Sequence, residues 1–441
     1  MSTFCVKVYG CQMNVYDADR VRTVLCSRGW QETDEDEADV VMITGCSVRA
    51  KAEQKVWSEL GLYEPSWQKN HRPIIALTGC IAQRLGERAL ARFPYVRLVA
   101  GPRHIGLLPN AIEQVAQHPS SRISLLDADP REFHELDIDG GADIKRANRY
   151  NAYVTIAHGC DNFCTYCIVP YVRGRFVSRK EEDVLDECRM LIDDGVKEIT
   201  LLGQNVNSYG KDTGLTFAGL LRKVARLDGI KRVRFVTSLP QDFTEDIADV
   251  MAEEETVCPS LNLPIQSGST RVLRLMNRKY TREEYFGKVA MLREKVPDVA
   301  LTTDIITGFP GETDEDFEDS LSALRELRFD LVHSAAYSER EGTPAATMEG
   351  ALPVELRLAR LNRLNELQDA ITLDINRQLE GQVLEVLADD PAPKGNDGEL
   401  QGRTPQDKVV IFKGSKSLLG EFVRVRITRA EAWCLHGEVM E

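Results

Sequence analysis

Three cysteines lie within one stretch of eight residues in the middle of the chain: Cys160, Cys164 and Cys167. At this spacing three thiolates can hold three irons of a 4Fe-4S cluster and leave the fourth iron without a protein ligand. An electron-transfer cluster usually has protein ligands on all four irons, whereas an open iron can take a substrate or cofactor. The motif therefore predicts an iron–sulfur cluster that takes part in chemistry.

Two other roles are compatible with the spacing of these thiols. Positions i, i+4 and i+7 would line one face of a buried helix, where thiols pack as small hydrophobes. Gly159 and Asp161-Asn162 favour a turn instead. Zinc sites usually pair two Cys-x2-Cys motifs, and the sequence contains no second one. The sequence therefore favours an iron–sulfur cluster over a buried helix or a zinc site.

A second set of cysteines recurs after apolar runs in the first hundred residues. Gly10-Cys11, Gly45-Cys46 and Gly79-Cys80 each follow such a run, about one strand–helix unit apart. One cysteine of this kind would be an ordinary core residue. Three of them, each after a glycine that permits a sharp turn, predict a second three-cysteine cluster.

The elements that would position this second set form an α/β domain, expected over residues 1–118. In an open parallel sheet, ligands bind at the carboxyl ends of the strands, so the three cysteines should converge on one edge. Residues 119–147 lose periodicity and are expected to be a linker. The predicted strands are residues 5–9, 40–43, 74–77 and 96–99.

Strands and helices alternate again over residues 148–376. Six strands with intervening helices fit a partial α/β barrel, whose active site lies at the strand carboxyl ends. The loop with Cys160 follows the first of these strands, where a barrel places its chemistry. The predicted strands are residues 152–156, 198–202, 233–236, 261–264, 300–303 and 331–334.

The last segment, residues 377–441, has short alternating strands over residues 382–387, 408–412 and 422–427, which predict a small barrel. The whole chain has a net charge of −14, which by itself argues against a nucleic-acid partner. However, the stretch from Arg403 to Arg429 contains seven basic residues and only two acidic ones. This module is a candidate RNA-binding surface, with an ordinary solvated face as the alternative.

The Cys160 motif resembles that of radical S-adenosylmethionine enzymes, in which the open iron binds S-adenosylmethionine. Gly203-Gln204 resembles the family segment that contacts the methionine amino group, and the run from Ile305 to Glu312 resembles its adenine-side strand and turn. The resemblance implies that Cys160, Cys164 and Cys167 are catalytic. It also implies five cofactor-binding residues: Tyr166, Gly203, Gln204, Gly308 and Glu312.

The Gly-Cys sites, the radical loop and the terminal module together resemble the methylthiotransferases over nearly the whole chain. The implied fold is α/β, with a flavodoxin-like open parallel sheet, a partial (β/α)6 radical barrel and a small antiparallel β-barrel called TRAM. Cys11, Cys46 and Cys80 match the ligands of that family's second cluster, which supplies or carries sulfur.

Within that family, Gly10-Cys11-Gln12-Met13-Asn14 and the run from Pro264 to Ser269 resemble the branch that modifies isopentenylated adenosine beside the tRNA anticodon. The threonylcarbamoyl-adenosine and ribosomal-protein branches remain alternatives, as does a non-catalytic iron–sulfur RNA-binding protein. Thr44-Gly45-Cys46 and Asn262 depart from commoner family residues, which affects substrate details more than chemistry.

The resemblance implies two 4Fe-4S clusters, S-adenosylmethionine, a tRNA substrate, a reductant such as flavodoxin or ferredoxin, and a sulfur donor. We expect a monomer. The start of the sequence lacks a basic leader before an apolar run, and no segment reaches transmembrane length. Eleven cysteines in such a chain should be reduced. We therefore expect a cytoplasmic protein with no membrane association.

Overall fold

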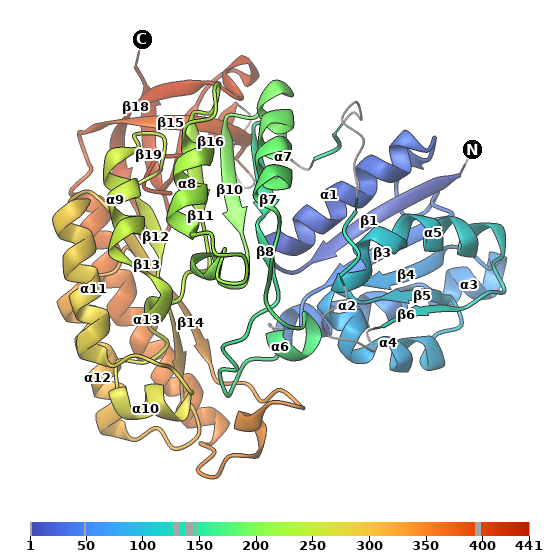
Figure 1. Ribbon diagram of the computed structural model, residues 1–441, viewed down its shortest axis with the longest axis horizontal. Coiled ribbons are helices and arrows are strands. Elements are labelled where there is room, and N and C mark those ends of the chain that lie inside the picture. The colour runs from blue at the N-terminus through green and yellow to red at the C-terminus, as the bar shows by residue number, and fades with distance from the viewer. Residues whose placement is uncertain are drawn as a thin grey trace. The chain divides into compact units, whose positions relative to one another are not determined.

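The computed structural model describes residues 2–47, 50–126, 133–136, 144–146, 148–392 and 398–440 (Figure 1). The chain divides into two compact units. The first contains Met1–Ala147 with the loop segments His158–Asn162 and Cys167–Val177, and the second contains the remainder. Among the described residues, no helix combines the length and apolar character needed to span a bilayer.

The first unit is built on a six-stranded parallel sheet in the order β2-β1-β3-β4-β5-β6. Apart from its last strand, this is the 2-1-3-4-5 order of flavodoxin-like folds. The expected open parallel sheet is confirmed. Its strands are β1 (Thr3–Tyr9), β2 (Gln31–Glu32), β3 (Val40–Gly45), β4 (Ile74–Thr78), β5 (Val96–Ala100) and β6 (Ile123–Leu125).

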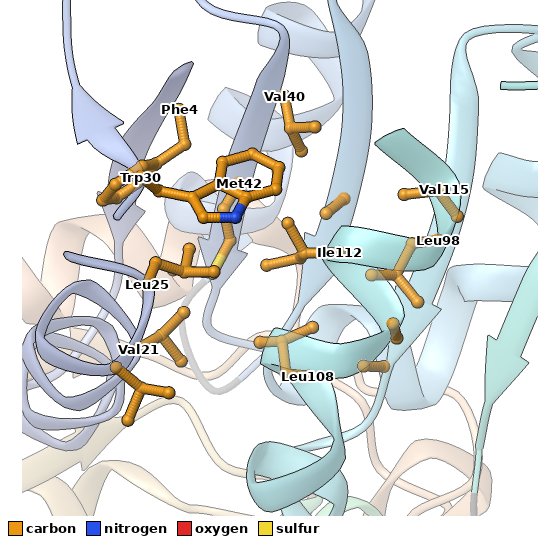
Figure 2. Packing of buried hydrophobic residues seen from close by; sticks show 14 of the residues in the cluster. Phe4, Val21, Leu25, Trp30, Val40, Met42, Leu98, Leu108, Ile112 and Val115 are labelled. Atoms are coloured by element: carbon orange, nitrogen blue, oxygen red, sulfur yellow. The ribbon is translucent and has the colours of Figure 1, made fainter. Parts of the chain in front are cut away.

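Helices cover both faces of this sheet because successive strand residues point to opposite sides. Val40 and Met42 pack against α1 (Gln12–Ser27) and α5 (Leu108–Gln117), as Figure 2 shows. Val41 and Ile43 belong to the core on the other face. That face is covered by α2 (Ala50–Leu62), α3 (Glu64–Asn70) and α4 (Cys80–Arg92), while the 3₁₀ helix η1 (Pro102–Leu107) precedes α5.

The segment expected to be a linker, residues 119–147, is partly folded onto the first unit. Strand β6 within it pairs with β5. Leu136 is buried in the same hydrophobic cluster as Val40 and Met42, and the backbone of His134 hydrogen-bonds with Arg103 and Gly106. The loss of periodicity reflects a short strand and isolated anchoring residues. Residues 127–132, 137–143 and 147 lie outside the described part.

The second unit contains the six expected strands, arranged as two three-stranded parallel sheets in the orders β11-β10-β7 and β12-β13-β14. Strand β11 also forms an isolated parallel bridge, between Val233 and Val257. The strands are β7 (Asn151–Thr155), β10 (Glu198–Leu202), β11 (Arg232–Phe235), β12 (Ser260–Asn262), β13 (Ala300–Thr307) and β14 (Leu331–Ala336). The short strands β8 (Ala157–His158) and β9 (Val177–Ser178) flank the cysteine loop.

Helices alternate with these strands, and α11 and α12 begin at capping boxes. Thr281 with Glu284, and Thr313 with Asp316, form capping boxes that satisfy the first backbone N–H groups of α11 and α12. The helices of the second unit are α7 (Glu181–Asp193), α8 (Phe217–Ala225), α9 (Glu245–Glu253), α10 (Thr270–Leu275), α11 (Arg282–Lys295), α12 (Asp314–Leu327) and α13 (Val354–Arg377). The short helix α6 (Val169–Val172) belongs to the first unit. The described residues of the second unit also form the 3₁₀ helices η2 (Val206–Ser208), η3 (Pro240–Asp242), η4 (Pro344–Thr347) and η5 (Lys416–Leu418).

The chain ends in a closed five-stranded barrel in the order β15-β16-β17-β19-β18. The small barrel is confirmed: its strand pairs are antiparallel except for β17 and β19, which pair in parallel. Two short strands, β16 and β19, escaped the sequence pattern. The strands are β15 (Val383–Pro391), β16 (Glu399–Arg403), β17 (Val409–Lys413), β18 (Phe422–Ala430) and β19 (Leu435–Val439).

Candidate functional site

The three amino-terminal thiols lie at the ends of neighbouring strands. Cys11 caps α1 directly after β1, Cys46 follows β3, and Cys80 begins α4 after β4. Because β1, β3 and β4 are adjacent and parallel, these ends share one edge of the sheet. Cys11 and Cys46 flank the β1/β3 switch point, where flavodoxin-like folds bind their cofactor. The predicted convergence is confirmed.

Close backbone approach brings these residues together. A Cβ on Gly10 would lie 2.9 Å from the Cys46 Cβ, and a Cβ on Gly79 would lie 2.8 Å from the Gly45 carbonyl oxygen. Gly79 also has φ +82°, a conformation that favours glycine. The Gly-Cys pairs are thus required by the turns that place the thiols.

Arg173 is a cation beside this triad. Its guanidinium is buried, and its Nε donates to the Cys80 Sγ at 3.2 Å. One Nη donates to Asn14 Oδ1 at 3.2 Å and lies 3.7 Å from an Asp17 oxygen. The Arg173 side chain therefore lies in direct contact with a thiol of the amino-terminal set.

The thiols differ in their electrostatic environment. Hydrogen bonding with Cys46 and the charge of Arg173 lower the pKa of the Cys11 thiol. Burial raises the pKa of Cys80, against the opposing effect of Arg173. Buried thiols with a nearby cation fit a cluster whose thiolates carry negative charge. Among described residues these thiols do not form a group with all donor atoms within 4.8 Å, as a single-ion site would require.

The loop with the second triad is not helical between Gly159 and Ile168. Gly159 has φ +70° and Phe163 has φ +46°, so the chain turns sharply between the cysteines. The buried helical stripe is therefore excluded. Pro170 lies in the first turn of α6 after the loop.

Polar side chains also contact the thiols of this loop. Asn162 Nδ2 donates to the Cys160 Sγ at 3.3 Å. In the second unit, the buried Arg278 donates to the Cys164 Sγ at 3.6 Å. Cys167 is half-buried. Donors to thiolate sulfur are one of the means by which proteins tune cluster potentials, so this donor set fits an iron–sulfur group.

Tyr166 lies among side chains that hold the loop in place. Its ring contacts Phe309 edge-on at 6.5 Å and lies 6.0 Å from the Arg278 guanidinium. The neighbouring backbone N–H of Thr165 donates to the Met276 carbonyl. These contacts give Tyr166 an anchoring role; its expected contact with S-adenosylmethionine stays a prediction.

The other expected cofactor-binding residues follow two strands of the second unit. Gly203 and Gln204 come directly after β10, and Gly308 comes after β13 with φ +70°. Glu312 accepts from the Gly308 N–H at 2.9 Å and pairs with Arg360 at 2.6 Å, while its side chain is 1% exposed. Its contacts support the turn around Gly308.

Asn262, a departure from the commoner histidine, lies at the end of β12. Its Nδ2 is 3.2 Å from both Thr302 Oγ1 and Asp304 Oδ2 on β13. The amide thus joins a polar group at neighbouring strands. This placement accounts for a hydrogen-bonding residue here and does not involve the thiols.

Known proteins resemble the chain along its full length. A tRNA-2-methylthio-N(6)-dimethylallyladenosine synthase from Moorella thermoacetica is 45% identical over 100% of this chain and 98% of the relative. The synthase of the same name from Aquifex aeolicus is 44% identical over 99% of this chain and 98% of the relative. The chain belongs to this family of synthases.

Three family models match separate parts of the chain. Residues 3–101 match a family described as uncharacterized protein family UPF0004, residues 154–324 match the radical SAM superfamily, and residues 377–440 match the TRAM domain. A radical SAM enzyme uses S-adenosylmethionine and a 4Fe-4S cluster. The three matches follow the order of the expected domains.

Solved structures share the fold. TsrM from Kitasatospora setae, a radical S-adenosylmethionine methyltransferase, matches with a TM-score of 0.58 at 14% identity, covering 87% of this chain and 78% of TsrM. The cobalamin-dependent S-adenosylmethionine radical enzyme OxsB matches with a TM-score of 0.51 at 13% identity, covering 84% and 56%. These similarities show the architecture alone.

Proposed function

We propose that this chain adds a methylthio group to C2 of isopentenylated adenosine beside the tRNA anticodon. The observation that carries the proposal is the presence of two cysteine sets in parts of the chain that match two different family models. Cys11, Cys46 and Cys80 end neighbouring strands of a flavodoxin-like sheet, and Cys160, Cys164 and Cys167 lie in a radical SAM loop. The full-length similarity to named synthases supports the substrate.

Each cysteine set would hold one 4Fe-4S cluster. When bound with S-adenosylmethionine, the cluster of Cys160, Cys164 and Cys167 supplies one-electron chemistry at an unactivated C–H bond. Cys11, Cys46 and Cys80 would hold the second cluster, on which sulfur is carried. Inserting sulfur at such a bond needs both a radical source and a sulfur carrier, which gives the two sets separate tasks.

Two arginines act on the thiols. Arg173 donates to Cys80 and Arg278 to Cys164, so each cysteine set has a buried guanidinium in contact. A positive charge and a hydrogen bond to sulfur both stabilise the reduced, more negative state of a cluster. These side chains would hold the reduction potentials of their clusters above the values expected without the arginine contacts.

The carboxyl-terminal barrel would bind the RNA. Arg424 and Arg426 point outward from β18, alternating with the buried Val423, Val425 and Ile427. Such a strand can contact phosphates. The proposal also includes a cytoplasmic location, a monomer, a flavodoxin- or ferredoxin-type reductant and a sulfur donor.

Nucleoside mass spectrometry of tRNA tests the substrate. In a strain lacking this gene and any redundant enzyme, 2-methylthio-isopentenyladenosine should disappear and isopentenyladenosine should accumulate. The wild-type gene should restore the product. Persistence of the product, or loss of methylthio-threonylcarbamoyl-adenosine instead, would contradict the proposal.

Iron counting tests the two clusters. Anaerobically reconstituted protein should hold about eight irons per chain, and replacing Cys11, Cys46 and Cys80 together by alanine should leave about four. Replacing Cys5 and Cys26, which lie in the same unit outside both sets, should leave the count unchanged. About four irons in the unaltered protein would rule out the second cluster.

A further inference from the structure

A cysteine, a histidine and a glutamate meet at the last turn of the carboxyl-terminal barrel, away from both cysteine sets in sequence. Glu431 follows β18, Cys434 precedes β19, and His436 lies on β19 (Figure 1). One donor atom from each lies within 4.8 Å of the other two. No step of the proposed reaction uses these residues.

The distances match one face of a zinc coordination tetrahedron. Cys434 Sγ lies 3.6 Å from His436 Nε2 and 3.7 Å from Glu431 Oε2, while His436 Nε2 lies 3.4 Å from Glu431 Oε1. Zinc binds sulfur at about 2.3 Å and nitrogen or oxygen at about 2.0–2.2 Å, so tetrahedral angles give edges of about 3.6, 3.6 and 3.4 Å. A small rotation of the carboxylate would place one oxygen against both neighbours.

The backbone that carries these ligands is held in place from outside the turn. The Glu431 N–H donates to the Cys434 carbonyl at 2.9 Å. Asn376, buried at the end of α13, donates to the carbonyl oxygens of Glu431 and Ala432 at 2.8 and 3.3 Å. The Nζ of Lys408 in turn donates to Asn376 Oδ1 at 2.9 Å. The ligands therefore start from a fixed turn, which reduces the entropy lost on binding.

We propose that Glu431, Cys434 and His436 bind a zinc ion. A thiolate with an imidazole and a carboxylate suits zinc, whereas calcium and magnesium prefer oxygen ligands alone. Three protein ligands leave the fourth position to water. The ion closes the turn that presents Trp433, whose side chain is 67% exposed. The site is independent of the proposed reaction, because its ligands lie outside both cysteine sets.

The test measures zinc on the full chain with its clusters loaded, without tRNA or S-adenosylmethionine. Equilibrium dialysis with metal analysis should find one zinc per chain. Cys434→Ser and His436→Gln should each weaken binding by more than the roughly 10–100-fold that loss of an outer hydrogen bond to a ligand costs. Cys26→Ser and His118→Gln are matched controls outside the turn and should bind zinc as the unaltered protein does.

Zinc K-edge absorption on the unaltered protein identifies the ligands even where a variant folds poorly. The proposal requires one sulfur at about 2.3 Å with nitrogen and oxygen neighbours. Three sulfur neighbours, with binding that survives Cys434→Ser, would place the ion on a cluster triad and overturn it. Absence of stoichiometric zinc would overturn it as well, and neither result would bear on tRNA methylthiolation.

Discussion

The guanidinium of Arg173 donates a hydrogen bond to the sulfur of Cys80 at 3.2 Å, and both side chains are buried. Arg173 belongs to the segment that follows the radical loop, whereas Cys80 begins α4 after a strand of the flavodoxin-like sheet. Within the first unit, a residue that follows the radical loop thus contacts a thiol of the amino-terminal triad.

Replacing Arg173 by alanine should lower the midpoint potential of the cluster proposed for Cys11, Cys46 and Cys80 by tens of millivolts. The variant removes a positive charge and a hydrogen bond to sulfur, both of which favour the reduced cluster. Redox titration followed by electron paramagnetic resonance would measure it, with Cys160, Cys164 and Cys167 replaced so that one cluster remains.

Arg175→Ala is the matched control, because Arg175 is half-exposed and pairs with Asp161. An unchanged potential in Arg173→Ala would show that the guanidinium does not act on the cluster. A similar drop in Arg175→Ala would point to a general charge effect.

Replacing Arg278 by alanine should slow cleavage of S-adenosylmethionine several-fold. Arg278 donates to Cys164 Sγ, so its loss should make the radical cluster harder to reduce. Formation of 5′-deoxyadenosine with a fixed chemical reductant measures the effect. Arg274→Ala, an exposed change on α10, should keep the unaltered rate. If the two variants cleaved S-adenosylmethionine at equal rates, Arg278 would have no part in the reaction.

The two arginines mark the limit of what the sequence predicts. The six thiols were found because local patterns reveal them, as Gly-Cys after apolar runs and as a dense motif. Arg173 lies 93 positions from Cys80 and Arg278 lies 114 positions from Cys164, so folding alone brings each pair together. Strands β16 and β19 were not predicted because each contains a glycine and few apolar residues, whereas β17, of the same length, is apolar.

Replacing Arg234 by alanine should lower the free energy of unfolding by about 3 kcal/mol. Arg234 is buried on β11, lies 3.0 Å from Glu198, and donates to the carbonyl oxygens of Thr404 and Pro405 at 2.7 and 2.8 Å. Breaking a buried ion pair costs about 3–5 kcal/mol. The low end applies because Arg232 remains 3.9 Å from Glu198.

Urea unfolding would measure this change. Arg222→Ala removes a more exposed pair with Glu253 and should cost less than about 1 kcal/mol. Equal effects of the two variants would mean that the contact between β11 and the terminal barrel adds little to stability.

Asp389 should make the unfolding free energy depend on pH. Burial raises the pKa of its carboxyl to about 6, and its Oδ1 has no hydrogen-bond partner among the described residues. The folded state therefore holds the proton more tightly than the unfolded state. Its contribution is complete below about pH 4 and is lost as the pH rises through 6.

As the pH rises from 5 to 7.5, loss of the Asp389 contribution should lower the unfolding free energy by about 1 kcal/mol. Asp389→Asn should remove that part of the pH dependence, as urea titrations of both proteins would show. Asp390→Asn, at the exposed neighbour whose charge adds a smaller effect than burial, should keep most of the dependence. Parallel curves for the unaltered protein and Asp389→Asn would contradict the shift.

The basic residues of the terminal barrel should differ in their effect on tRNA binding. Arg424 points outward from β18, whereas Lys408 is turned inward to Asp330 at 2.7 Å. Arg424→Ala should weaken tRNA binding and reduce the slope of log affinity against log salt by about one, because one phosphate contact is lost. Lys408→Ala should lower stability and leave the slope unchanged. A reduced slope for Lys408→Ala alone would mean that β18 does not face the RNA. A count of charges in the sequence cannot distinguish the two residues.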